Sequence, residues 1–330
     1  MAKWKRWWIE VLILVAGFSL VGSSWAAEFP TKNIEILAPF GATASSALSL
    51  RVMADALSKI LGKQVLVVPA PGAGGTIAAN RVAKAKPDGY TLLGANPASV
   101  VTSLYLQKDV TYKISDFEFL AEYGVLDLGL SVKPNSPLKT LEDYIDYARK
   151  HPSELKQAIS GYGTIGHLCF ELLKLKAGGL KIDTVPFKTP YEMRTAVLGG
   201  HCDASFIYGG TGGPTDEIRQ MLADGGRILA VATRHRLKAY PDIPTLKEKG
   251  YDVAFSAWWG IAGPRGMPRE VSEKLKKALY QVVKDPQVVQ DVEKSGFRIE
   301  FRNSEEFTNL VKEDDNTIKK VVKEAKLQVD

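Results

Sequence analysis

Residues 34–69 read IEILAPFGATASSALSLRVMADALSKILGKQVLVVP, and this stretch determines the fold class. It contains two short apolar runs, Ile34–Pro39 and Val65–Pro69, whose β-branched residues are typical of buried strands. Between them apolar residues recur at helical spacing, and Gly62 follows the last turn as a stop signal. The apolar face consists of Leu50, Met53, Leu57, Ile60 and Leu61. A strand, a helix and a second strand in this order predict a parallel βαβ unit.

The same alternation continues along most of the chain. We expect further extended segments at Thr91–Ala95, Leu126–Val132, Gln157–Ser160, Asp183–Pro186, Ala204–Tyr208, Ile228–Ala232 and Trp258–Ala262. We expect helices at Thr76–Ala85, from the Thr140 cap to about Lys150, and at Thr164–Ala177, Tyr191–Leu198, Asp216–Leu222, after Pro268 and from Ser304. The predicted fold class is α/β, with doubly wound, mainly parallel sheets flanked by helices.

A chain of this length without a flexible linker needs two hydrophobic cores. The economical arrangement is two α/β lobes, with the chain crossing between them twice. Leu126–Val132 and Ala230–Arg234 are the extended segments best placed for these crossings. The ligand site is then expected in the cleft between the lobes, at the carboxyl ends of their strands.

The first 26 residues have the pattern of a secretory signal peptide. Lys3, Lys5 and Arg6 precede an apolar stretch, Val11–Val21, that is short for a membrane-spanning helix. Small residues at positions 24 and 26 fit a cleavage site before Ala27. We therefore expect export from the cytoplasm, with an uncleaved anchor as the alternative.

Composition excludes several classes of function. The chain has 43 Lys and Arg residues against 37 Asp and Glu residues, and residues 27–330 keep a net charge of +4, so neither nucleic acid nor an acidic membrane surface is expected as a partner. The four histidines lack metal-ligand spacing, so no metal site is expected. Cys169 and Cys202 leave two alternatives open, one disulfide or two buried thiols.

Two turns rich in small residues each lead from a predicted strand into a predicted helix. Their exposed N–H groups, together with the positive end of the helix dipole, suit an anion. Serines at positions 45 and 46 could instead be plain N-caps. The candidate ligand contacts in the first turn are Phe40, Ala42, Thr43, Ser45 and Ser46, and those in the second are Gly161, Tyr162, Gly163, Thr164 and Ile165.

The second turn also reads G-x-G-x-x-G, with Asp183 about 20 residues further on. This matches the dinucleotide fingerprint, but free dinucleotides are scarce outside the cytoplasm, so the pattern favours a carboxylate and no cofactor is expected. His167 lies in the first turn of the predicted helix, where capping or packing is favoured over ligand contact.

Other candidate contacts follow the ends of neighbouring strands. Phe187 and Lys188 come after Asp183–Pro186. The alternative for Lys188 is a solvated surface lysine that makes no ligand contact. Asn96 and Ser99 hold a comparable position after Thr91–Ala95. Tyr208 begins a glycine-rich run that either presents more amides or forms a mobile turn.

The sequence contains no G-x-S-x-G elbow and no pair of carboxylates with an acid/base division. The candidate turns are rich in amide donors and poor in groups that transfer protons. This profile favours ligand capture over catalysis, so the chain is not expected to be an enzyme, and a secreted α/β hydrolase is the less favoured alternative.

A set of ordered motifs extends over nearly all of the chain after the signal. They are Phe29-Pro30-x-Lys32-x-Ile34, Pro39-Phe40 with Arg51, Leu61-Gly62-Lys63, Pro71-Gly72-Ala73-Gly74-Gly75, Ala85–Leu92, Gly161-x-Gly163-Thr164 with His167, Val185–Lys188, Leu198-Gly199-Gly200, Pro241–Thr245, and Trp258-x-Gly260 with Pro264-x-Gly266-x-Pro268. Together they resemble the periplasmic solute receptors of tripartite tricarboxylate transporters, the Bug receptors.

The resemblance implies a two-lobed type II periplasmic binding protein, of the Venus-flytrap kind, that closes over an organic acid. The lobes are then residues 27–128 with 234–330, and residues 129–233. In this family the Pro-Phe turn and the Gly-x-Gly-Thr turn bind one carboxylate. The implied receptor is a periplasmic monomer that delivers the acid to two membrane subunits driven by an ion gradient. A sensory receptor for a membrane kinase is the alternative.

The chain departs from the family pattern in the first turn. Thr43-Ala44 replaces a glycine pair, and Ala47 stands where an aspartate is expected. The usual Tyr-Lys-Gly is Phe187-Lys188-Thr189. These changes remove a negative charge beside the cleft, so the choice between aliphatic di- or tricarboxylates and aromatic acids stays open.

Overall fold

The computed structural model describes residues 28–41, 45–187, 189–213 and 216–327. It divides into two units, Met1–Thr31 and Lys32–Asp330. In the first unit only residues 28–31 are described, and they form no helix or strand. The predicted signal peptide, residues 1–26, lies outside the described residues.

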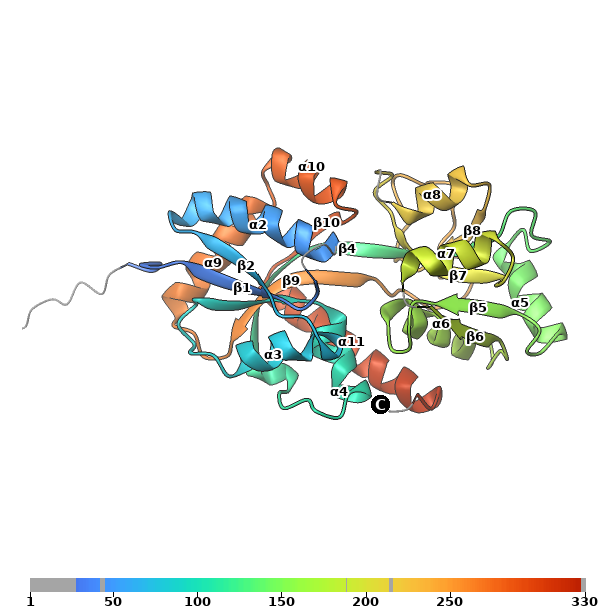
Figure 1. The fold of residues 1–330 in the computed structure, drawn as a ribbon, viewed down its shortest axis with the longest axis horizontal. Coiled ribbons are helices and arrows are strands. Elements are labelled where there is room, and N and C mark those ends of the chain that lie inside the picture. The colour runs from blue at the N-terminus through green and yellow to red at the C-terminus, as the bar shows by residue number, and fades with distance from the viewer. Residues whose placement is uncertain (1–27, 42–44, 188, 214–215, 328–330) are drawn as a thin grey trace, which may run out of the picture. The chain divides into compact units, whose positions relative to one another are not determined.

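Ten strands form one mixed sheet in the described part of the second unit (Figure 1). They are β1 (Ile34–Ala38), β2 (Val65–Pro69), β3 (Thr91–Ala95), β4 (Phe117–Val132), β5 (Lys156–Ile159), β6 (Asp183–Pro186), β7 (Ala204–Gly209), β8 (Arg227–Val231), β9 (Ala257–Pro264) and β10 (Arg298–Arg302).

Helices connect and cover these strands. The longer helices are α2 (Ser45–Leu61), α3 (Thr76–Ala83), α5 (Leu141–Lys150), α6 (Ile165–Lys176), α7 (Pro190–Leu198), α8 (Glu217–Ala223), α9 (Arg269–Val282), α10 (Pro286–Lys294) and α11 (Ser304–Glu324), and the short elements are η1 (Ala73–Gly75), η2 (Ala98–Thr102), α4 (Ser103–Leu106) and η3 (Ile114–Asp116).

The sheet has the order β2-β1-β3-β9-β4-β7-β5-β6, and β8 and β10 also pair with β4. Strands β1, β2 and β3 pair in parallel, and so do β5, β6 and β7. All pairings of β4 and β9 are antiparallel. The parallel βαβ units predicted from the sequence are therefore present, and antiparallel strands join them into a mixed sheet.

Strand β4 belongs to both parts of the sheet. It pairs with β9 as far as Leu126, opposite Ala257, and with β7 from Asp127 onward, opposite Gly209. Figure 1 shows it running from the strands beside β9 to those beside β7. The sequence predicted only Leu126–Val132 of this strand, as a crossing, and did not predict residues 117–125. The lobe boundaries stay a prediction.

Local sequence explains where individual helices begin and end. Along α2 the predicted residues Leu50, Met53, Leu57 and Leu61 are buried, whereas Ile60, which was predicted on the same face, is exposed near the end of the helix. The helix ends at Leu61 and is followed by Gly62, whose φ of 69° is in the left-handed region that favours glycine and whose N–H donates to the Ser58 carbonyl at 3.0 Å. Helix α5 begins at a capping box in which the Thr140 hydroxyl accepts from the Asp143 N–H.

Buried apolar side chains of the described residues gather in clusters, of which two contain the cysteines. Cys169 belongs to the larger cluster and Cys202 to the smaller one, and both are buried free thiols. Of the two alternatives left open by the sequence, the structure therefore has separate thiols. Within the residues that the structure describes, we find no helix with the length and apolar character required to traverse a bilayer.

Candidate ligand-binding site

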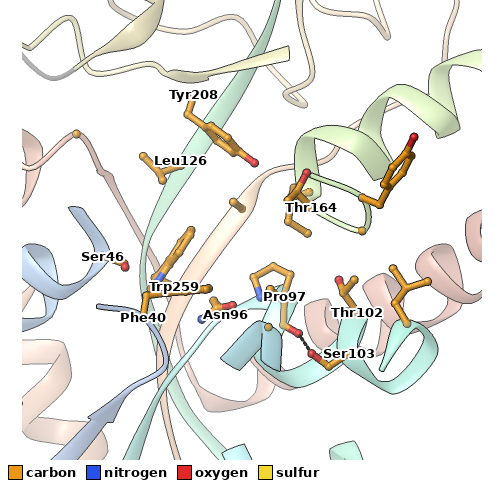
Figure 2. Close-up of a pocket in the computed structure, with 18 of the residues that line it drawn as sticks. Phe40, Ser46, Asn96, Pro97, Thr102, Ser103, Leu126, Thr164, Tyr208 and Trp259 are labelled. Carbon is orange, nitrogen blue, oxygen red and sulfur yellow. Dashed lines mark hydrogen bonds between the residues drawn. The ribbon is translucent and has the colours of Figure 1, made fainter. Parts of the chain in front are cut away.

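A pocket of about 400 Å³ lies beside β4 and β9 (Figure 2). This volume suits a small organic ligand. Its lining residues are Phe40, Ser46, Gly74, Asn96, Pro97, Ala98, Thr102, Ser103, Leu106, Gln107, Leu126, Tyr162, Gly163, Thr164, Ile165, Tyr208, Glu217, Ala257, Trp259, Ser295 and Gly296.

The turn between β5 and α6 forms one wall of this pocket. Gly161 and Gly163 have φ values of 101° and 74°, in the left-handed region. A Cβ atom on Gly163 would lie 2.5 Å from Leu106 Cδ1, so a larger residue here would also force the Leu106 side chain to move. The Thr164 hydroxyl donates to the Gly161 carbonyl at 2.9 Å and accepts from the His167 N–H at 3.4 Å, which makes it the N-cap of α6.

Side chains behind the turn bind two of its N–H groups. The Gly163 N–H donates to His167 Nδ1 at 3.0 Å, and the Gly166 N–H donates to the Tyr208 hydroxyl at 3.2 Å. His167 is 1% exposed, so it supports the turn, as the sequence favoured. Burial raises the pKa of Tyr208 to about 12, so this hydroxyl keeps its proton and can donate it.

The first N–H of α6 belongs to a residue that lines the pocket. Ile165 is the first residue of that helix, so its N–H has no acceptor within the helix. Because it lies at the positive end of a helix of 12 residues, this N–H favours a negatively charged acceptor.

The opposite wall contains buried polar atoms that lack a hydrogen-bond partner. Figure 2 shows Asn96, Pro97 and Thr102 across the pocket from Tyr208 and Thr164. Asn96 Oδ1 accepts from the Ser99 N–H at 3.1 Å, whereas Asn96 Nδ2 has no partner among the described residues. Thr102 Oγ1 and Trp259 Nε1 are also buried and have no hydrogen-bond partner among the described residues.

These three unpartnered atoms belong to residues that line the pocket. A buried polar group without a partner destabilises a protein by about 1–3 kcal/mol. The Asn96 amide nitrogen and the Trp259 indole nitrogen can only donate, and the Thr102 hydroxyl can donate as well. A ligand with several acceptor oxygens, such as a carboxylate, would satisfy them.

The first predicted turn is only partly described. Phe40 and Ser46 line the pocket, and Ser45 begins α2. Ala42, Thr43 and Lys188 lie outside the described residues. Ala47, which stands where the family has an aspartate, is 1% exposed.

The structure brings together most of the predicted contacts that it describes. Phe40, Ser46, Asn96, Tyr208 and the stretch Tyr162–Ile165 all line the pocket. Gly161 lies in the turn just outside the lining. Ser99 is buried against Asn96, and Phe187 packs on the smaller apolar cluster, so neither lines the pocket as it stands.

Sequence reasoning missed Thr102, Trp259 and Glu217, which also line the pocket. Trp259 had a usable signal, because neighbouring residues of a predicted strand point to opposite faces. Trp258 accordingly lines a second, charged cavity and Trp259 lines this one. Thr102 lies in a short helical segment without periodicity, and nothing in the sequence indicated Glu217.

The electrostatics of the pocket are simple. Of the described lining residues, Glu217 alone has a charged side chain. Neutral donors would therefore bind an anion here. Across the described part of the chain, no group of three or more His, Cys, Asp and Glu side chains is arranged to bind a metal ion.

Comparison with known proteins gives consistent matches. The family described as "Tripartite tricarboxylate transporter family receptor" matches residues 49–327. A UPF0065 protein from the TAR-I ttuE–ttuC′ intergenic region of Agrobacterium vitis is 33% identical over 272 residues, which cover 81% of this chain and 77% of the relative.

Solved structures are similar over the same range. A TctC solute-binding protein from Polaromonas, without ligand, has a TM-score of 0.79 at 24% identity and covers 90% of this chain and 99% of its own. Rpa4515 from R. palustris, solved with adipate, has a TM-score of 0.73 at 26% identity and covers 89% of this chain and 97% of its own. The predicted two-lobed α/β class is thereby confirmed.

Proposed function

Because this chain belongs to the tripartite tricarboxylate transporter receptor family, we propose that it captures a small carboxylate in the pocket by lobe closure. Residues 27–128 with 234–330 would form one lobe and residues 129–233 the other. In this proposal residues 1–26 export the chain to the periplasm, and the closed receptor delivers its ligand to two membrane subunits of a tripartite carrier.

The observation that carries the proposal is the set of three buried, unpartnered polar atoms on Asn96, Thr102 and Trp259. In this proposal the three atoms donate to the ligand carboxylate from the wall that contains Asn96, Thr102 and Trp259. Charge-assisted hydrogen bonds contribute about 1.5–3 kcal/mol each. Three of them would contribute about 5–9 kcal/mol before the costs of ordering are subtracted, and a micromolar dissociation constant corresponds to about 8 kcal/mol, so further contacts with the body of the ligand are also needed.

Two further observations support a carboxylate. The related R. palustris protein was solved with adipate, a dicarboxylate. In this chain, the described pocket residues supply neutral donors at the start of α6, the arrangement that binds anions without a cationic side chain.

Calorimetry on residues 27–330 tests the proposal with matched pairs of acids and amides. We expect benzoate and hexanoate derivatives to bind at least about tenfold more tightly than the corresponding amides, because an amide offers one acceptor oxygen and no charge. The bound acid should be recovered chemically unchanged, since the proposed receptor performs no reaction. Equal affinity for acid and amide, or a chemically altered ligand, would contradict the proposal.

Small-angle scattering tests closure separately. We expect a smaller radius of gyration in the presence of a saturating carboxylate than in its absence. An unchanged radius with a demonstrably bound ligand would contradict closure and would leave carboxylate capture in place.

A further inference from the structure

Glu217 places a carboxylate in a pocket that otherwise presents neutral side chains among its described lining residues. It is the first residue of α8, next to the N-cap Asp216. Its Oε2 atom accepts from the Tyr208 N–H at 3.1 Å, which fixes the side chain on the wall formed by β7 and α8. No hydrogen bond to a described residue engages its Oε1 atom.

The charged neighbours of Glu217 do not neutralise it within the pocket. Arg194 on α7 pairs with Asp224 at 3.1 Å, and Asp216 accepts from backbone N–H groups and from the Tyr240 hydroxyl. Neither Arg194 nor Asp216 lines the pocket. Burial raises the pKa of Glu217 to about 6, with the nearby Arg194 charge acting against this shift and Asp216 adding to it.

The two walls of the pocket therefore have opposite preferences. Asn96 and Trp259 offer unpartnered donors, whereas Glu217 offers an unpartnered acceptor oxygen among the described residues. Tyr208, whose N–H binds Glu217, lies across the pocket from Asn96 in Figure 2. Apolar residues also line the pocket, among them Phe40, Leu126 and Ile165.

Given the proposed receptor function, we propose that Glu217 makes this site selective for monocarboxylates with an apolar body and a hydroxyl or amino donor at the far end, and against dicarboxylates. The ligand carboxylate binds at the wall of Asn96 and Trp259, and the distal donor reaches Glu217 Oε1. A second carboxylate at that end meets a like charge in a partly desolvated pocket, where repulsion is stronger than in water.

Three ligands that differ only in their para substituent test this selectivity on residues 27–330. They are 4-(hydroxymethyl)benzoate, 4-methylbenzoate and benzene-1,4-dicarboxylate. Near pH 7.5, where Glu217 is ionised, we expect calorimetry to give the hydroxymethyl acid the highest affinity and the dicarboxylate an affinity at least about tenfold lower. The methyl acid should lie between them, because it neither donates to Glu217 nor repels it.

Two independent changes should remove the preference for the hydroxymethyl acid over the dicarboxylate. Glu217→Gln keeps an acceptor for the Tyr208 N–H and removes the charge, so the affinity for the dicarboxylate should rise to within about threefold of that for the hydroxymethyl acid. In the unmodified protein, lowering the pH from about 7.5 to about 5.5 neutralises much of Glu217 and should shift the ratio in the same direction. This second measurement needs no variant to fold.

Glu273→Gln is the matched control. It removes the same charge from α9, where Glu273 pairs with Lys276 outside the pocket, so the affinity ratio should stay as in the unmodified protein. An affinity for the dicarboxylate equal to or above that for the hydroxymethyl acid would overturn the role of Glu217 and leave the receptor function standing. A ratio of these two affinities that neither Glu217→Gln nor the change of pH altered would overturn the role of Glu217 as well. If no acid bound to any form of the protein, the proposed function itself would fail.

Discussion

Arg298 forms a bidentate ion pair with Asp127, with Nε 2.7 Å from Oδ2 and Nη2 3.1 Å from Oδ1. Asp127 is fully buried and is the residue of β4 at which pairing passes from β9 to β7. The Ser256 hydroxyl donates to the same carboxylate at 3.2 Å, just before β9 begins. One buried charge therefore connects β10, β4 and the start of β9 at the junction between the two parts of the sheet.

Replacing this arginine should destabilise the fold strongly. Arg298→Met keeps the aliphatic stem and leaves Asp127 buried without its counter-charge, which we expect to lower the free energy of unfolding by about 2–4 kcal/mol, allowing for the partial exposure of the arginine. Urea denaturation measures this change. Adding Asp127→Asn to the variant should restore part of the loss, because it removes the unpaired charge. A loss below about 1 kcal/mol would contradict this account.

The indole nitrogen of Trp259 should matter for ligand binding and not for the stability of the free protein. It has no partner to lose among the described residues, and Phe retains the edge-to-face contact with Phe297, whose ring centroid lies 4.9 Å away. We expect Trp259→Phe to weaken carboxylate binding by about 1–2 kcal/mol in calorimetry and to leave the melting temperature of the free protein nearly unchanged.

The neighbouring tryptophan is the matched control for this prediction. Trp258 Nε1 donates to Asp314 Oδ2 at 2.6 Å and lines the second cavity instead. Trp258→Phe should lower stability by about 1–3 kcal/mol and leave ligand affinity unchanged. If both substitutions acted alike on affinity, the placement of the ligand beside Trp259 would be wrong.

The Thr164 hydroxyl should contribute to both stability and ligand binding, because it holds the turn between β5 and α6 in place. Thr164→Val removes both its bond to the Gly161 carbonyl and the cap of α6, so we expect a loss of about 1 kcal/mol in stability and weaker carboxylate binding. Thr164→Ser keeps the hydroxyl and should retain both properties. Chemical denaturation and calorimetry measure the two effects. Full ligand affinity in Thr164→Val would remove this turn from the site.

Much of the fold was predictable because it depends on local signals. Val65–Pro69, Thr91–Ala95 and Asp183–Pro186 are strands with the predicted bounds, since β-branched residues there are flanked by glycine, proline or polar residues. Strand β10 was missed although its sequence, Arg298–Arg302, alternates charged and apolar residues, the pattern of a half-buried strand. Its charges find partners such as Asp127 only in the folded chain. Helix α10, which precedes β10, was also missed, although Asp285-Pro286 before it is a helix start signal.

The residues of the site also divide into those that local sequence signals predict and those that depend on contacts between distant segments. The turn around Thr164 was found because its glycines and its position after a strand are local features. On the other side of the pocket, Phe40, Ser46 and Asn96 were found because they follow the ends of the predicted strands β1 and β3. Alternation along the predicted strand separates Trp259 from Trp258 but does not say which of the two faces the pocket. Glu217 reaches the pocket through helix packing between segments far apart in the chain, which periodicity cannot predict.

Stability should decrease as pH rises through neutrality because of Asp314. Burial raises the pKa of this carboxyl to about 7, and the hydrogen bond from Trp258 only partly opposes the shift. A carboxyl with a raised pKa in the folded state stabilises the fold fully below its ordinary pKa, and this contribution is lost as the pH approaches 7. We expect a loss of about 1–2 kcal/mol between about pH 5 and pH 8 from this group. Asp314→Asn keeps an acceptor for the Trp258 N–H, so urea denaturation of this variant should show a weaker dependence on pH in that range. An identical pH dependence in both proteins would mean that Asp314 is already ionised at pH 5.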